Sequence, residues 1–126
     1  MARGTSRRRP EQVGEIIRQV VAETLTREVR DPRIGFVTLT RVEVSGDLSH
    51  ATVFVMAQGD DTEREKAVEG LKSAAGFLRR KVAGELATRI TPELHFELDR
   101  GLEHAARINA VLEDLRRGEG DGEAAG

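Results

Sequence analysis

The 126-residue sequence lacks cysteine, tryptophan and tyrosine, and it contains only three prolines and four phenylalanines. Without cysteine, neither a disulfide framework nor a cysteine-ligated metal site can form, which fits a reducing compartment. No run approaches the roughly 20 apolar residues of a membrane-spanning helix. The N-terminal segment is basic but no apolar stretch follows it, so it is not typical of a secretory signal. We therefore expect one domain of a soluble, cytoplasmic protein.

The shortage of aromatic residues limits how this chain could recognise a nucleic acid. Most of its aromatics, Phe36, Phe54 and Phe96, are expected in the core, with Phe77 as the exception. A platform on which bases stack is therefore not expected. Any binding of nucleic acid must depend on phosphate contacts, helix termini and shape.

Motifs of catalysis are absent as well. The sequence contains no Gly-x-Ser-x-Gly elbow, no Walker loop and no dinucleotide-binding fingerprint. His50, His95 and His104 show no helical ligand spacing, so in a chain without cysteine we expect no zinc site and no cofactor. The acidic pair Asp60–Asp61 is better explained as a helix cap than as a catalytic dyad. We predict a protein that is not an enzyme.

Charge is abundant but unevenly placed. Charged residues make up 33% of the chain, yet the net charge is only −2. Residues 1–10 and residues 71–90 each carry a net charge of +4, whereas residues 113–126 carry −3. Basic zones attract phosphate, although runs of charge are also typical of solvated helix faces.

Apolar periodicity predicts three helical segments. The first runs from Pro10 to Asp31, where the following proline ends it. A second apolar stripe covers residues 67–86 and keeps its phase across Gly70 and Gly76, each of which costs about 1 kcal/mol relative to alanine. This stripe fits either one bent helix or two packed helices. A last helix is expected over residues 102–116.

Three segments have the pattern of strands. Phe36–Val44 and His50–Met56 flank a Ser-Gly-Asp turn and should form an antiparallel hairpin. The apolar phase of the first strand changes near Thr40, which would fit a β-bulge. Leu94–Leu98 alternates apolar and charged residues, so one face of the sheet should be buried and the other solvated. The order predicts an α+β fold with a three-stranded sheet and helices on one face.

The predicted organisation is a flexible basic arm (residues 1–9), one folded domain (residues 10–116) and a disordered acidic tail (residues 117–126). Small residues around Gly76 would let an RNA backbone come close to the protein, and a helix restarting there would present free N–H groups. The same small residues would equally allow close packing against the sheet. The candidate RNA-binding residues are Arg7, Arg8, Arg9, Lys72, Ser73, Ala74, Ala75, Gly76, Arg79, Arg80 and Lys81.

Four passages of the chain resemble the ribosome-binding factor A family. The most specific is Asp31–Asp47, which is similar to the strand and turn that mark the family. The others are Arg9–Ile17, similar to its opening helix, Ala74–Arg79, similar to its helix–kink–helix, and Pro92–Phe96 with Ala106–Asn109, similar to its last strand and helix. In this family an Ala-x-Gly break replaces the Gly-x-x-Gly loop of KH domains, and the expected order of elements matches the type II KH arrangement.

The resemblance implies a monomeric, non-catalytic assembly factor with a KH-like fold. It implies binding to the free small (30S) ribosomal subunit and its 16S rRNA near the 5′ terminal helix, with a role in late maturation and rRNA processing that is often most needed in the cold. A KH-like RNA-binding protein with a non-ribosomal target is the alternative. A third hypothesis is an adaptor that binds proteins through the exposed sheet face.

Overall fold

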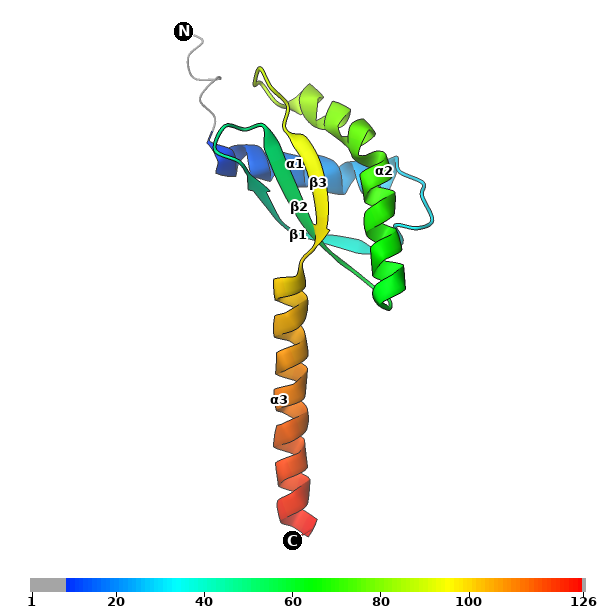
Figure 1. Cartoon of the computed structure of the whole chain (residues 1–126), viewed down its shortest axis with the longest axis vertical. Coiled ribbons are helices and arrows are strands. Elements are labelled where there is room, and N and C mark those ends of the chain that lie inside the picture. Colours follow the sequence, from blue (N-terminus) through cyan, green and yellow to red (C-terminus); the bar gives the residue numbers. More distant parts are fainter. Residues whose placement is uncertain (1–8, 126) are drawn as a thin grey trace.

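The computed structural model describes residues 9–125, and of these the side chains of all but residues 102–104, 106 and 119–125. Three helices and three strands follow one another along the chain (Figure 1). Their bounds are α1 Pro10–Arg27, β1 Val37–Val44, β2 His50–Ala57, α2 Asp61–Glu85, β3 Glu93–Leu98 and α3 Arg100–Ala125.

The three strands form one mixed sheet in the order β1-β2-β3. The hairpin strands β1 and β2 are antiparallel, whereas β3 returns after α2 and pairs parallel to β2. Helix α1 packs on β1, α2 packs on β3, and the two helices pack on each other. The α+β fold predicted from the sequence, with a single three-stranded sheet, is confirmed.

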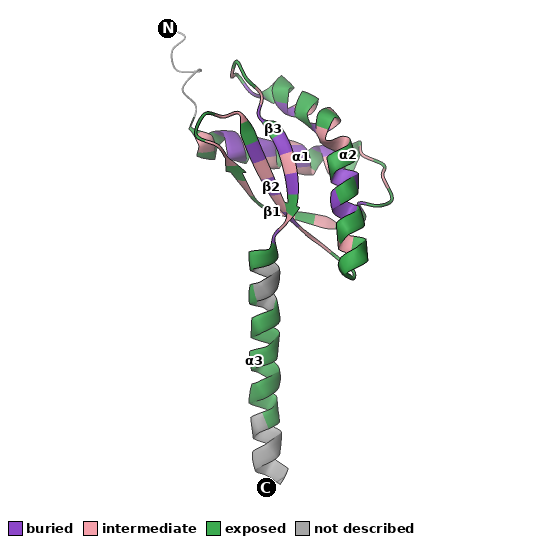
Figure 2. Ribbon diagram, in the orientation of Figure 1, coloured by how far each residue is buried: buried purple, intermediate pink, exposed green. Residues whose placement is uncertain are grey.

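The core lies between one face of the sheet and the apolar stripes of α1 and α2. In β3 the alternation has the predicted phase, because Leu94 and Phe96 are buried while Glu93 and Glu97 are exposed. The central strand β2 alternates in the same way, and Figure 2 shows the resulting buried bands along the strands and the two helices. The buried apolar residues are Val13, Ile17, Val21, Ile34, Ala51, Val53, Val55, Ala67, Val68, Leu71, Leu78, Val82, Leu86, Leu94 and Phe96.

The bulge predicted in the first strand is present. The β1–β2 register shifts between Leu39 and Arg41, so Thr40 is the extra residue. Its hydroxyl lies 2.6 Å from Oδ2 of Asp99, a carboxylate that is only 5% exposed, and Arg41 Nε lies 3.4 Å from the same oxygen. The bulge thus brings a hydroxyl and a guanidinium to a buried charge at the end of β3.

Three carboxylates stabilise the start of α2 and the β1–β2 turn through local hydrogen bonds. At the start of α2, Asp60 accepts a hydrogen bond from the backbone N–H of Glu63 and Glu63 accepts one from the N–H of Asp60, which forms a capping box and confirms the predicted helix cap. In the β1–β2 turn, Asp47 Oδ1 accepts from the hydroxyls of Ser45 (2.7 Å) and Ser49 (2.6 Å) and from the Ser49 N–H (3.0 Å). These hydrogen bonds, that of the Ser49 hydroxyl first, lower the pKa of Asp47 to about 2.

Two predicted boundaries of the N-terminal half are wrong. Helix α1 ends at Arg27 rather than at Asp31, because the N–H groups of Glu28 and Val29 both donate to the Thr24 carbonyl and close the last turn. Strand β1 begins after Phe36, and the Phe36 side chain is 82% exposed instead of buried. Gly35 before it has φ +54, a turn that carries the chain into β1 with the ring outside the core.

Helix α3 differs most from the sequence prediction. It continues to Ala125 instead of ending at residue 116, so it includes residues 117–125, and it extends away from the sheet rather than packing on it (Figure 1). Residues 117–125 contain no proline, and each glycine there destabilises the helix by only about 1 kcal/mol relative to alanine. No helix within residues 9–125 is long and apolar enough to cross a bilayer. The apolar residues of α3 that remain 44–58% exposed are Ile108, Val111, Leu112 and Leu115.

Replacing Phe96 tests the position of the core. Its side chain is 1% exposed beneath α1 and α2, so Phe96→Ala should lower the free energy of unfolding by about 3–5 kcal/mol. Denaturant unfolding of the two proteins measures the difference. A change below about 1 kcal/mol would mean that this face of β3 is not the buried one.

Asp47 in the hairpin turn should make the stability of the fold depend on pH in the acidic range. A folded-state pKa of about 2 against an ordinary 3.8 means that ionised Asp47 stabilises the fold above pH 3.8, and that this contribution is lost as the pH falls through 2. Asp47→Asn should therefore melt at a lower temperature than the parent at pH 6, and the two curves should converge toward pH 2. A difference in melting temperature that stays constant from pH 6 to pH 2 would contradict this account.

Candidate nucleic-acid interface

The predicted basic zone lies on the second half of α2 and the loop that joins it to β3. A hollow of about 600 Å³ opens beside Gly76 between the helix and this loop. Arg80 and Arg89 line it and are exposed, and neither forms an ion pair with any of the described side chains. The full lining is Gly76, Arg79, Arg80, Ala83, Arg89, Ile90 and Thr91.

Arg79 also lines this hollow, but its guanidinium is already engaged. Its Nη2 donates to the Thr91 carbonyl at 2.7 Å, and its Nε lies 3.2 Å from the carbonyls of both Thr91 and Pro92. These bonds fix the loop against α2 just before β3 begins. Arg79 therefore positions the loop that carries Arg89, in addition to contributing positive charge.

Lys81 and Phe77 belong to the side of α2 that faces α1. Lys81 Nζ lies 2.9 Å from Glu28 Oε1, so much of its charge is compensated by an ion pair. Two cations lie close to the half-buried Phe77 ring, with Lys81 Nζ 5.3 Å and the Arg80 guanidinium 5.9 Å from its centre. This arrangement keeps Phe77 from acting as a free stacking surface.

Helix α2 passes Gly76 without interruption. Residues 61–85 form one α-helix, which changes direction along its length in Figure 1, so of the two possibilities the bent helix is the observed one. The expected second helix N-terminus with free N–H groups is therefore absent from α2. Gly76 is exposed, whereas Ala74 and Ala75 are half-buried against the core.

The two glycines of α2 serve different purposes. A methyl group at Gly76 would meet only Arg80 Nη1 at 3.9 Å, so packing does not require glycine there. A methyl group at Gly70 would lie 2.8 Å from Ile34 Cγ1 and 3.3 Å from Asp31 Oδ2. Gly70 thus allows the loop after α1 to insert Ile34 against α2, which offsets its low helix propensity.

This loop brings one further arginine to α2 that the sequence did not reveal. Arg33 Nη2 donates to Ser73 Oγ at 3.2 Å, across 40 positions of sequence, and to Asp31 Oδ2 at 2.6 Å. The Arg33 hydrogen bonds lower the pKa of the Asp31 carboxyl, and the same pairing raises the pKa of Arg33. Arg33 and Ser73 come together only in the folded protein, so no spacing in the sequence predicts their contact.

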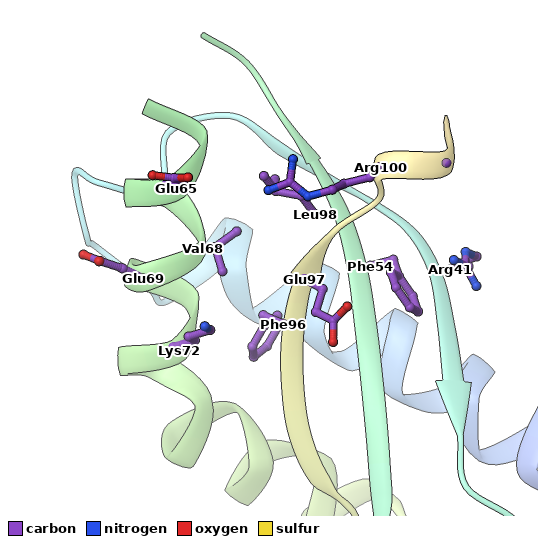
Figure 3. A pocket seen from close by; sticks show the side chains of 11 residues that line it. Arg41, Phe54, Glu65, Val68, Glu69, Lys72, Phe96, Glu97, Leu98 and Arg100 are labelled. Carbon is purple, nitrogen blue, oxygen red and sulfur yellow. The ribbon is translucent and has the colours of Figure 1, made fainter. Parts of the chain in front are cut away.

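Lys72 lies apart from the arginine hollow. It points from α2 toward β3 in a separate pocket of about 600 Å³ (Figure 3). Glu65, Glu69 and Glu97 line the same pocket, together with Arg41 and Arg100. Of the N-terminal arginines, Arg9 precedes α1, where its N–H donates to Gln12 Oε1 at 3.2 Å, while Arg7 and Arg8 lie outside the described residues.

The structure thus divides the candidate residues into three groups. Arg79 and Arg80 join Arg89 at the hollow, Lys81 pairs with α1, and Lys72 lies in the pocket beside β3. A helix, a hairpin, a second helix and a parallel third strand, with both helices on one face, define a KH-like domain.

Comparison with known proteins gives the family. The sequence model of ribosome-binding factor A matches residues 9–112, and the chain belongs to this family. It is 50% identical over 109 residues to ribosome-binding factor A of Thermomicrobium roseum, covering 86% of this chain and 84% of that protein. It is 43% identical over 113 residues to that of Halothermothrix orenii, covering 90% and 93%.

Solved structures agree with this assignment. The crystal structure of ribosome-binding factor A from Thermus thermophilus matches with a TM-score of 0.63 at 26% identity, over 72% of this chain and 97% of that one. A homology model of the Thermus thermophilus protein, fitted into a cryo-EM map of its complex with 30S, matches with a TM-score of 0.59 at 26% identity, over 72% and 96%.

The two glycines of α2 provide a matched pair of substitutions. Gly76→Ala should leave the free energy of unfolding unchanged or raise it by up to about 1 kcal/mol, since the methyl group enters open space. Gly70→Ala should lower it by about 1–3 kcal/mol, because Ile34 must move. Equal destabilisation by both, in denaturant unfolding, would show that Gly76 too is a packing glycine.

Proposed function

We propose that this protein is a non-catalytic, monomeric assembly factor that binds the free 30S ribosomal subunit in the cytoplasm. It contacts 16S rRNA near the 5′ terminal helix and assists late maturation of the subunit and processing of its rRNA. The observation that carries the proposal is the match to the Thermus protein fitted into a map of its complex with the 30S subunit. Family membership over residues 9–112 supports the same role.

The arginine hollow beside Gly76 is the proposed point of contact with the rRNA backbone. Arg80 and Arg89 lie on two different elements and line one solvent-exposed hollow, and neither forms an ion pair with a side chain that the structure describes. Guanidinium groups form paired hydrogen bonds with phosphate oxygens. The missing side chain at Gly76 gives a phosphate room beside the helix, and the bonds of Arg79 hold the loop in place before RNA arrives.

Sedimentation of a cell lysate tests the proposed target. The protein should migrate with free 30S subunits and be absent from 70S ribosomes. Migration with an RNA fraction that contains no ribosomal subunits would favour a different RNA target. If the protein migrates neither with 30S subunits nor with another RNA fraction, the result would contradict an RNA-binding role. It would instead favour a protein-binding role for the exposed sheet face.

Neutralising the hollow should reduce the salt dependence of binding. If Arg80 and Arg89 each contact one phosphate, Arg80→Gln with Arg89→Gln should flatten the slope of log affinity against log salt by roughly 1.4–1.8. Affinity for purified 30S subunits, measured at several salt concentrations, gives this slope.

The matched control is Arg27→Gln, which removes an exposed arginine from the last turn of α1 that does not line the hollow. It should leave the slope and the affinity nearly unchanged. A double variant at the hollow that binds like the parent at every salt concentration would exclude this surface as the phosphate contact.

A further inference from the structure

Three potential metal ligands meet on the uncovered face of the sheet, at the starts of β2 and β3. His50 is the first residue of β2, and Glu93, the first residue of β3, is its partner in the parallel register. His95 follows two positions later, so it projects from the same face as Glu93. His50 and Glu93 are exposed and His95 is half-buried. Neighbouring strands fix the relative positions of all three.

The separations of the ligand atoms match a tetrahedral site. His50 Nδ1 lies 3.0 Å from His95 Nε2 and 3.8 Å from Glu93 Oε1, and His95 Nε2 lies 3.4 Å from that oxygen. An ion with bonds of about 2.0–2.1 Å in tetrahedral geometry holds its ligand atoms roughly 3.3–3.4 Å apart. The three observed distances bracket this value, so an ion equidistant from all three atoms fits with only small movements of side chains.

We propose that His50, Glu93 and His95 form a binding site for one Zn²⁺ ion, with water in the fourth position. Two imidazoles and one carboxylate are a donor set that Zn²⁺ prefers, whereas Mg²⁺ and Ca²⁺ require oxygen ligands alone. The exposure of His50 and Glu93 leaves the fourth position open to solvent. Helical spacing is the usual sequence signal for paired histidines, and here two parallel strands supply the proximity instead.

The ion would connect the central strand to the edge strand. Strand β3 pairs with the sheet on one side only, and Glu93 directly follows the Thr91–Pro92 segment held by Arg79. Zn²⁺ would therefore strengthen the start of β3 and the adjoining loop together. Because unfolding separates the strands, the ion binds the folded state in preference, and its binding free energy appears as stability.

Thermal melting of the full chain, prepared without a histidine tag and freed of metal by a chelator, tests the site. Zn²⁺ in roughly tenfold excess over its dissociation constant should raise the melting temperature by about 5 °C. Equilibrium dialysis should find one Zn²⁺ per chain. Co²⁺ in its place should give the intense visible absorption of tetrahedral coordination.

The variants His50→Gln, Glu93→Gln and His95→Gln each remove one ligand. Each should weaken Zn²⁺ binding at least roughly tenfold, since losing even an outer-shell partner costs that much. The controls are Glu97→Gln, on the same face of β3, and His104→Gln, the remaining histidine, and both should bind Zn²⁺ like the parent.

Melting of the metal-free variants establishes that they fold, and the three single changes give three independent tests. Failure of Zn²⁺ to raise the melting temperature of the parent would overturn the proposal. So would an equal rise in the folded ligand variants, because binding would then lie elsewhere on the chain.

Discussion

Burial of a single sheet face beneath two helices is the constraint on which the rest of this structure depends. Phe96 and Val53 face α1 and α2, so the residues that alternate with them along β3 and β2 must face solvent. The same alternation that builds the core therefore places His50, Glu93 and His95 together on the open side. The packing of one face thus determines both the hydrophobic interior and the chemistry available at the surface.

The return of the chain through α2 links the two surfaces of interest. A parallel strand needs a crossover, and α2 provides it by spanning the sheet before the loop turns back into β3. The end of that crossover carries the arginine hollow, and the strand that follows begins with Glu93. Arg79 holds the junction through the Thr91 and Pro92 carbonyls. A substitution that moves this junction would therefore displace residues of both the proposed RNA contact and the proposed metal site.

Features governed by local periodicity could be predicted from the sequence. The alternation over Leu94–Leu98 indicated the buried face, and the phase change near Thr40 indicated the bulge, because both follow from the two-residue period of a strand. The helix cap predicted at Asp60–Asp61 also depends only on neighbouring residues, and Asp60 forms it with Glu63. Each of these features depends only on residues that are close in the sequence, so the sequence pattern is sufficient to predict it.

Features that depend on distant contacts could not be predicted. Arg33 reaches Ser73 and His50 reaches His95 only after folding, and the exposure of Phe36 depends on a positive φ at Gly35. The apolar stripe of α3 predicted that this helix packs on the domain, yet its apolar residues are exposed. Periodicity shows that a helix has an apolar face, but not that another surface covers it. The basic residues among the RNA-binding candidates were chosen for their charge, and the sequence could not show that Glu28 forms an ion pair with Lys81.

Helix α3 should also give this protein two melting processes rather than one. Its residues from Ile108 to Leu115 remain largely exposed, so tertiary packing does little to hold the helix together (Figure 2). Isolated helices are marginal in water, and they fray from their ends over a broad temperature range. Ellipticity in the far ultraviolet would then decline gradually with α3 before the sheet and its two helices unfold cooperatively. A single transition temperature drawn from helicity would therefore misreport the stability of the core.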